Sequence, residues 1–122
     1  ILNYNPLIIC DTGHNEDGIR EVMKNINLTP HKDLYMVIGM VEDKDISKIL
    51  SLLPQRAFYY FCQPNIPRAK PANDLQLEAA KFGLTGAFYP TVQAAFDEAK
   101  KNAGNNDLIF IGGSTFVVAE II

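Results

Sequence analysis

Short apolar runs alternate along this chain with longer stretches in which apolar residues recur every three or four positions. The runs are bounded by residues that favour turns, and they cover positions 7–10, 34–38, 57–61, 86–89 and 108–111. Runs of this length and composition are typical of strands that are buried on both faces of a sheet. We therefore predict five such strands.

The stretches between these runs have the period of amphipathic helices. The apolar spacing i, i+3, i+4, i+7 occurs over 19–26, 46–53 and 92–99. This spacing predicts three helices, and the first of them covers 16–28 with Asn15 as its N-cap residue.

Capping residues predict two further helices. Asn73 and Gln76 have the spacing of a capping box, which predicts a helix that runs to about residue 82. Ser114 is placed to cap a last helix over 115–122.

The regular order of strand and helix predicts a single α/β domain over 1–122. We expect a three-layer α/β/α, Rossmann-like arrangement, with a mainly parallel sheet of about five to six strands and helices on both faces. The crossovers are expected to be right-handed. The carboxyl ends of the strands then meet at one edge of the sheet, which is where ligands bind in open α/β folds.

Composition and charge narrow the class of partner. A hydrophobic content of 48% and a charged content of 20% over 122 residues are typical of a soluble globular domain. The net charge of −3, with no basic stretch that contains aromatic residues, argues against nucleic acid as a partner. No apolar stretch is long enough to span a membrane. Cys10 and Cys62 lie in apolar runs, which favours buried thiols of a cytoplasmic protein. The first residue is Ile rather than Met, so we expect this chain to be one domain of a longer protein.

The segment after the first apolar run combines most of the candidate chemistry. It contains Asp11, Gly13 and His14 ahead of a predicted helix. A carboxylate at a strand end is suited to accept hydrogen bonds from ligand hydroxyl groups, and a histidine that titrates near neutral pH is suited to donate to a phosphate or carboxylate. The alternative is that Asp11 only caps the turn and His14 lies on the surface. We favour the functional interpretation.

Three other segments at the predicted edge are candidates for ligand contact. Residues 112–115 (Gly-Gly-Ser-Thr) either let the backbone approach an anion or form a tight turn that Ser114 caps, and the two readings are equally supported. Arg68, in a proline-rich loop, is suited to a bidentate contact with carboxylate or phosphate, although a solvated loop is the simpler reading. Lys44 is a candidate contact among acidic residues that otherwise suit a helix N-terminus.

Several chemistries have no support in the sequence. No Walker loop occurs, and no Gly-x-Gly-x-x-Gly follows the first strand, which disfavours a dinucleotide oxidoreductase. No His/Cys cluster has metal-ligand spacing, so we predict no metal site.

Together the motifs resemble those of folylpolyglutamate synthases and dihydrofolate synthases, which belong to the Mur ligase superfamily. Residues 7–18 are similar to that family's Asp-x-Ala-His-Asn-Pro-x-Gly segment, with Gly13 in place of Ala and Glu16 in place of Pro. The similarity continues, in order, over Asp43-Lys44-Asp45, Pro67-Arg68-Ala69 and 111–116.

The resemblance implies the C-terminal domain of an ATP-dependent ligase that joins glutamate to a folate or dihydropteroate carboxylate through an acyl phosphate. ATP and Mg²⁺ would serve the full-length enzyme, with the P-loop and metal ligands on a central domain outside this chain. Carried over, Asp11 contacts the nucleotide and His14 lies near the reacting groups, while Arg68, Ser114 and Lys44 contact substrate. The resemblance also implies a six-stranded sheet with an antiparallel first strand, of which this chain retains little.

Two alternatives stay open. One is the C-terminal domain of a cell-wall Mur-type ligase, and the other is a standalone Rossmann-like binding module. The Pro-Arg-Ala loop and the Asp-x-x-His-Asn run favour the folate enzymes over both.

Overall fold

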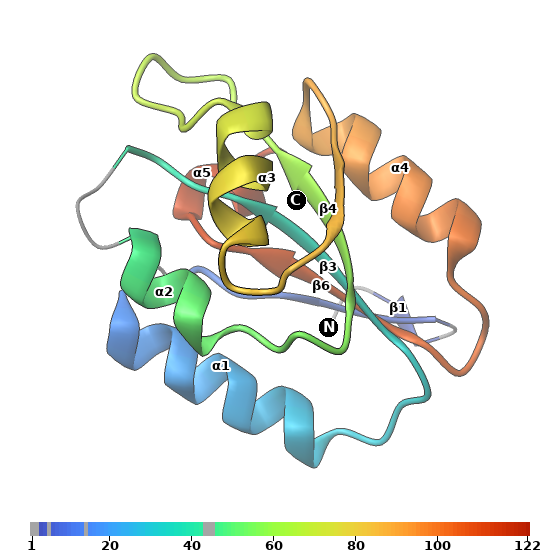
Figure 1. Cartoon of the computed structure of the whole chain (residues 1–122). Coiled ribbons are helices and arrows are strands. Elements are labelled where there is room, and N and C mark those ends of the chain that lie inside the picture. The colour runs from blue at the N-terminus through green and yellow to red at the C-terminus, as the bar shows by residue number, and fades with distance from the viewer. Residues whose placement is uncertain (1–2, 5, 14, 43–45) are drawn as a thin grey trace.

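A computed structural model describes residues 3–4, 6–13, 15–42 and 46–122 of the chain. In this part of the chain, strands and helices alternate around one sheet (Figure 1). The elements in chain order are β1 (Asn3–Tyr4), β2 (Leu7–Cys10), α1 (Glu16–Leu28), β3 (Leu34–Gly39), α2 (Ile46–Leu52), β4 (Phe58–Cys62), α3 (Ala72–Ala80), β5 (Gly86–Phe88), α4 (Val92–Asn102), β6 (Leu108–Gly112) and α5 (Thr115–Ala119).

The sheet has six strands in the order β1-β2-β6-β3-β4-β5. Strand β6 lies between β2 and β3, because Leu108 is in register with both Leu7 and Leu34. All pairs from β2 to β5 are parallel, whereas β1 pairs with β2 in the antiparallel sense. The predicted α/β class and mainly parallel sheet are confirmed, and so is the antiparallel first strand that the resemblance implied.

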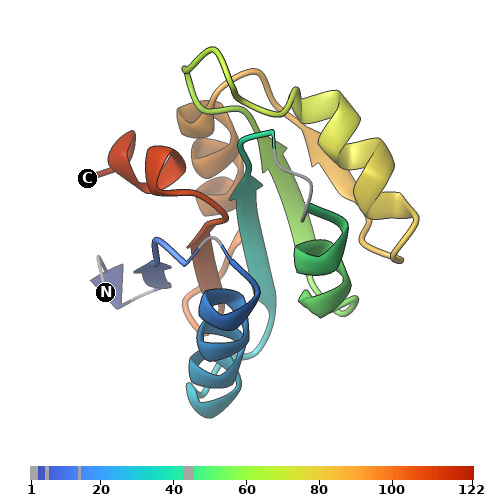
Figure 2. The same ribbon diagram turned by 90° about the vertical axis from the view of Figure 1, so that its left-hand side faces the viewer.

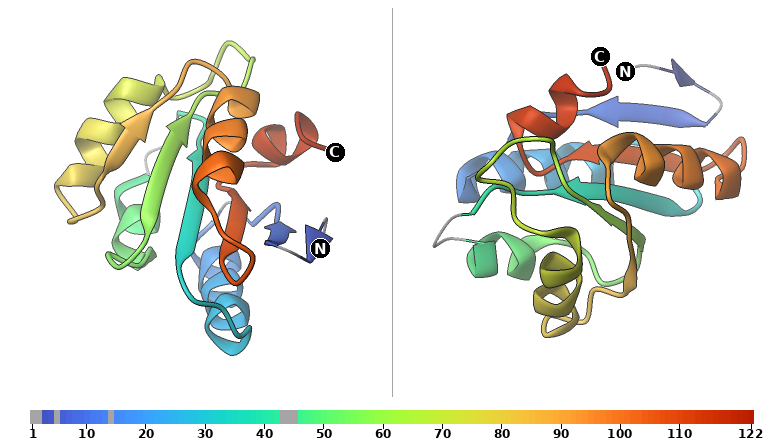
Figure 3. Two further views of the ribbon diagram at one scale, coloured as in Figure 1. Left: turned by 90° about the vertical axis from the view of Figure 1, so that its right-hand side faces the viewer. Right: turned by 90° about the horizontal axis from the view of Figure 1, so that it is seen from above.

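Helices cover both faces of the sheet, as predicted (Figures 2 and 3). Helices α1, α2 and α3 pack against one face, around Met36, Phe61 and Phe110, which are fully buried. Helices α4 and α5 pack against the other face, around Val37 and Ile109. Adjacent residues of a central strand thus serve opposite cores, which is why the strands read as continuous apolar runs.

The helix starts follow capping chemistry at two of the predicted positions. The Asn15 side chain accepts a hydrogen bond from the Gly18 amide at 2.8 Å, so the prediction of Asn15 as the N-cap of α1 is confirmed. Ser114 caps α5 in the same way. The acidic residues Glu16 and Asp17 lie in the first turn of α1, where they interact favourably with the helix dipole.

Three expectations about local structure are wrong. Helix α3 begins after Pro71 with no side-chain cap, so Asn73 and Gln76 form no capping box there. The amide of Ala72 instead donates a hydrogen bond to Oε1 of Gln63, at 3.1 Å. Strand β5 is exposed along its length because it is the edge strand, and α5 ends at Ala119, because the residues beyond it form turn-type bonds.

Within the described residues, no helix has the length and apolar character needed to cross a membrane.

Candidate functional site at the carboxyl edge of the sheet

The carboxyl ends of the parallel strands meet at one edge of the molecule. In Figure 2 strands β3 and β4 point upward, and the loop between β4 and α3 lies at the top. The end of β2 is fixed to β6 because the amide of Asp11 donates to the carbonyl of Ile111 at 3.1 Å. The sequence-predicted residues Asp11, Arg68 and Ser114 all follow strand ends at this edge.

Asp11 forms a tight turn directly after β2. Its Oδ1 atom accepts a hydrogen bond from the amide of Gly13 at 2.8 Å, and the residue is half-buried. A Cβ at position 13 would lie 3.1 Å from that oxygen and from the backbone of Gly18, so the turn is closely packed against α1. The turn-capping role weighed for Asp11 is therefore present, and it occupies one carboxylate oxygen.

Two of the predicted site residues, His14 and Lys44, lie outside the described residues. Their roles stay predictions.

The glycines after β6 are explained by close packing of three strand ends. Gly113 has φ +97°, and a Cβ there would lie 2.5 Å from the carbonyl oxygen of Gly39. A Cβ at Gly112 would lie 2.9 Å from the carbonyl oxygen of Asp11. Of the two readings of this segment, the tight turn is the one that the geometry displays.

Ser114 is buried, with 2% of its surface exposed. Its Oγ accepts from the amide of Phe116 at 3.0 Å and so caps α5. The capping prediction is confirmed, while the predicted contact between Ser114 and substrate stays a prediction.

Arg68 belongs to an anchored loop. The amide of Glu42 donates to the carbonyl of Arg68 at 2.7 Å, and the amide of Lys70 donates to the carbonyl of Met40 at 2.8 Å. These bonds flank an antiparallel bridge between Val41 and Ala69 and join the loop to the end of β3. The Arg68 side chain is exposed, and its Nη2 lies 3.4 Å from the carbonyl oxygen of Glu42. The simple reading of a solvated loop therefore understates how firmly this segment is held.

An apolar hollow of about 400 Å³ adjoins Arg68. Its other lining residues are Val41, Ile66, Pro67 and Phe116, and the Phe116 side chain is 48% exposed. Phe116 is a lining residue that was not predicted from the sequence. The available signal was an aromatic residue two positions after a capping serine, at a point where a surface helix ordinarily carries a polar residue.

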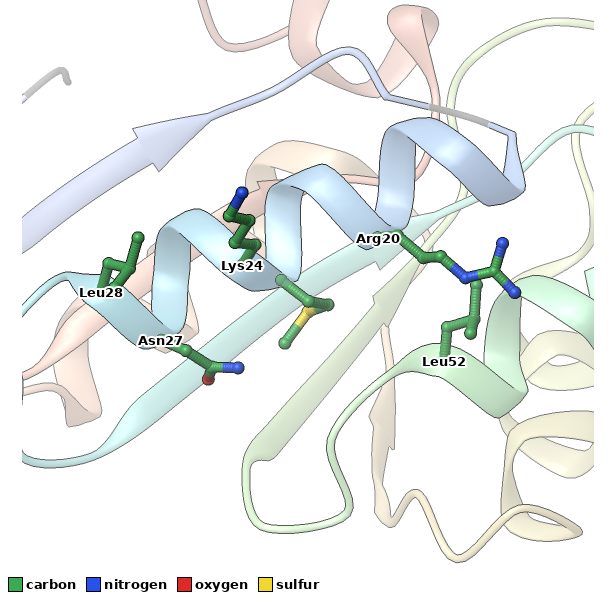
Figure 4. Close-up of a pocket in the computed structure, with 6 residues that line it drawn as sticks. Arg20, Lys24, Asn27, Leu28 and Leu52 are labelled. Carbon is green, nitrogen blue, oxygen red and sulfur yellow. The ribbon is translucent and has the colours of Figure 1, made fainter.

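Other hollows lie away from the strand ends. A groove between α1 and α2 is lined by Arg20, Lys24, Leu28 and Leu52, among others (Figure 4). The Arg20 guanidinium is already paired with Glu16 at 3.0 Å. The groove therefore brings no additional candidate chemistry to the edge.

The thiols are unsuited to nucleophilic chemistry. Burial, with a smaller contribution from the charge of Glu120, raises the pKa of Cys62 well above its ordinary value. Burial also raises the pKa of Cys10. A raised pKa disfavours the reactive thiolate. Across the part of the chain that the structure describes, no three His, Cys, Asp or Glu residues gather as a metal site would require.

The fold and the edge define the class of this protein: it is a Rossmann-like α/β domain with candidate ligand groups at the carboxyl ends of its strands. Comparison with known proteins then identifies the family. The model of the Mur ligase glutamate ligase domain matches residues 1–115, and the chain belongs to this family.

Named relatives agree with this assignment. A probable bifunctional folylpolyglutamate synthase/dihydropteroate synthase of Haloferax volcanii is 30% identical over 98% of this chain and 14% of its own length. The structure of E. coli FolC in complex with DHPP and ADP superposes with a TM-score of 0.90 at 27% identity, over 99% of this chain and 29% of that one. A bifunctional folylpolyglutamate synthase/dihydrofolate synthase with Mn, AMPPNP and L-glutamate bound gives 0.87 at 25% identity, over 99% and 29%. The chain thus spans less than a third of each.

Proposed function

We propose that this chain is the C-terminal domain of an ATP-dependent ligase that forms an amide bond between glutamate and a folate or dihydropteroate carboxylate. The observation that carries the proposal is the similarity to E. coli FolC over 99% of this chain, in a complex with DHPP and ADP. The relative with bound AMPPNP and L-glutamate supports the same substrates. The P-loop and the remaining substrate contacts are proposed to lie on the rest of a larger polypeptide, which works in the cytoplasm.

The proposed reaction has two steps. The terminal phosphoryl group of ATP passes to the substrate carboxylate, which gives an acyl phosphate and ADP. The amine of glutamate then attacks the acyl carbon, the amide bond forms, phosphate leaves with the bonding electrons, and the amine loses a proton to solvent. Such a reaction depends on positioning and on stabilising negative charge, and closure of a domain over the cleft protects the acyl phosphate from water.

Asp11 is proposed to contact the nucleotide through its ribose hydroxyl groups. A carboxylate repels phosphate unless a cation lies between them, whereas it accepts hydrogen bonds from hydroxyl groups. A carboxylate has about four acceptor positions, so the bond from Gly13 at 2.8 Å leaves acceptors for the ligand. His14 is proposed to lie near the reacting phosphate or the incoming glutamate.

Arg68 is proposed to bind a carboxylate of glutamate beside the apolar hollow. The guanidinium supplies the charge, and the aromatic face of Phe116 and the ring of Pro67 supply a surface for the methylene groups. Lys44 and Ser114 are proposed as further substrate contacts. Mg²⁺, when bound, would neutralise phosphate charge, and its ligands are proposed to lie elsewhere in the larger protein.

The test uses the longer protein with Asp11→Asn, which retains an acceptor for the Gly13 amide and loses the charge. We expect the KM for ATP to rise about 10-fold to 100-fold with kcat less affected, since one charged hydrogen bond contributes about 1.5–3 kcal/mol. The assay measures ATP-dependent addition of glutamate to dihydropteroate and to reduced folate. Asp74→Asn, on the exposed first turn of α3, is the matched control.

Each other outcome has a defined meaning. Wild-type kinetics in Asp11→Asn would contradict the proposed nucleotide contact and leave Asp11 with only its role in the turn. A wild-type protein that adds no glutamate to either acceptor would contradict the proposed function, and activity on a cell-wall precursor in its place would identify the other branch of the Mur ligases.

A further inference from the structure

Lys70 is a largely buried cation close to the candidate site. It follows Arg68 and Ala69 in the loop between β4 and α3, and its side chain is only 16% exposed. Its Nζ atom lies 3.6 Å from a carboxylate oxygen of Glu78 on α3 and 4.0 Å from a carboxylate oxygen of Glu42. A cation this deeply buried is costly unless it is paired, so the two carboxylates account for its stability there.

The pairing fixes the carboxylate of a residue that already contacts Arg68. The backbone carbonyl oxygen of Glu42 accepts a hydrogen bond from Arg68 Nη2 at 3.4 Å. The amide of Glu42 donates to the backbone carbonyl of Arg68 at 2.7 Å. The Glu42 side chain is 54% exposed, so packing against the protein does not fix the direction of its carboxylate. Lys70 is the cation that draws this carboxylate toward α3.

We propose that Lys70 is a positioning residue that keeps the carboxylate of Glu42 away from Arg68. Without the ammonium group, Glu42 and Glu78 repel each other, and Arg68 is a cation among the described residues whose side chain already contacts Glu42. An Arg68 guanidinium paired with its own neighbour is no longer available to a substrate carboxylate. The inference rests on the proposed function, in which Arg68 binds glutamate.

The test is a pair of variants in the intact protein. We expect Lys70→Met to raise the KM for glutamate about tenfold, the lower end of what one charged hydrogen bond contributes, with the KM for ATP and kcat unchanged. Adding Glu42→Gln to Lys70→Met removes the competing carboxylate and restores the KM. Lys70→Arg keeps the charge and stays close to wild type. Lys101→Met, on the exposed end of α4, is the matched control.

A merely structural role for Lys70 gives a different pattern. In that case Glu42→Gln fails to restore the KM, or kcat and the KM for ATP change together with the KM for glutamate, and the proposal is overturned. Circular dichroism checks the fold, and Lys70→Gln replaces Lys70→Met if the latter does not fold. An active wild type with an unchanged Lys70→Met overturns the positioning role alone, whereas an inactive wild type overturns the proposed function and the inference with it.

Discussion

A substitution at Gly113 distinguishes the two explanations for the glycine pair after β6. One is the tight turn, and the other is close approach of the backbone to an anion. The φ of +97° at Gly113 costs a residue with a Cβ about 1–3 kcal/mol. The added atom would also lie 2.5 Å from the carbonyl oxygen of Gly39 and 3.3 Å from Ile38 Cγ2. Forcing an extra methyl group into such a contact costs about another 1–3 kcal/mol. We therefore expect Gly113→Ala to lower the free energy of unfolding by about 2–5 kcal/mol.

Urea and thermal unfolding of the chain, followed by circular dichroism, measure this change. For 122 residues, each kcal/mol lowers Tm by about 4 °C, so the expected shift is about 8–20 °C. Gly104→Ala is the matched control, because the nearest atom to its added Cβ is 3.5 Å away and its φ is not positive. We expect that control to lie within about 0.5 kcal/mol of wild type.

The refuting result is a Gly113→Ala variant as stable as Gly104→Ala. It would show that the strand ends tolerate a side chain at position 113. Close approach to an anion would then be the remaining reason for the glycine, and nucleotide affinity in the larger protein would be the property to measure.

Two further predictions concern the interior. Because burial raises the pKa of Cys62, the thiol ionises from about pH 8.5 in the unfolded chain only. The free energy of unfolding then falls as pH rises above that value, by up to about 1.4 kcal/mol per pH unit. Urea unfolding between about pH 7.5 and about pH 10 measures this fall in the free energy of unfolding, and the part caused by Cys62 should be absent in Cys62→Ala. Asp107→Ala is expected to lose about 2–4 kcal/mol, because buried Asp107 accepts from the amides of Asp33 at 3.1 Å and Gly104 at 2.7 Å. Calorimetry beside Asp74→Ala tests this, and equal Tm values would contradict it.

The fold could be predicted from the sequence where the pattern of apolar residues indicated only one kind of element. The central strands β3 and β6 are buried on both faces, so their apolar runs identified them without ambiguity. The edge strand β5 was found by its apolar residues although it is exposed. The start of α3 could not be predicted, since Ala72 is capped by Gln63 from across a loop, and no local pattern encodes a contact nine residues away.

The candidate site was predictable only in part. Asp11 and Arg68 were visible because chemistry-bearing residues follow strand ends, and parallel topology brings strand ends together. The sequence did not indicate what holds them. The bridge between Val41 and Ala69 and the ion pairs of Lys70 join segments that are more than twenty-five residues apart or lie on different elements, so they exist only in the folded chain.

These anchors bear on how the domain would act in catalysis. Asp11 is tied to its turn, Gly113 is packed against the end of β3, and the Arg68 loop is bonded to the same strand end. Groups held in this way lose little conformational entropy when a ligand arrives. Under the proposed function, a domain that presents these groups together would gain more from moving as one body than from rearranging single loops. Variants that loosen one anchor should therefore weaken ligand binding before they slow chemistry.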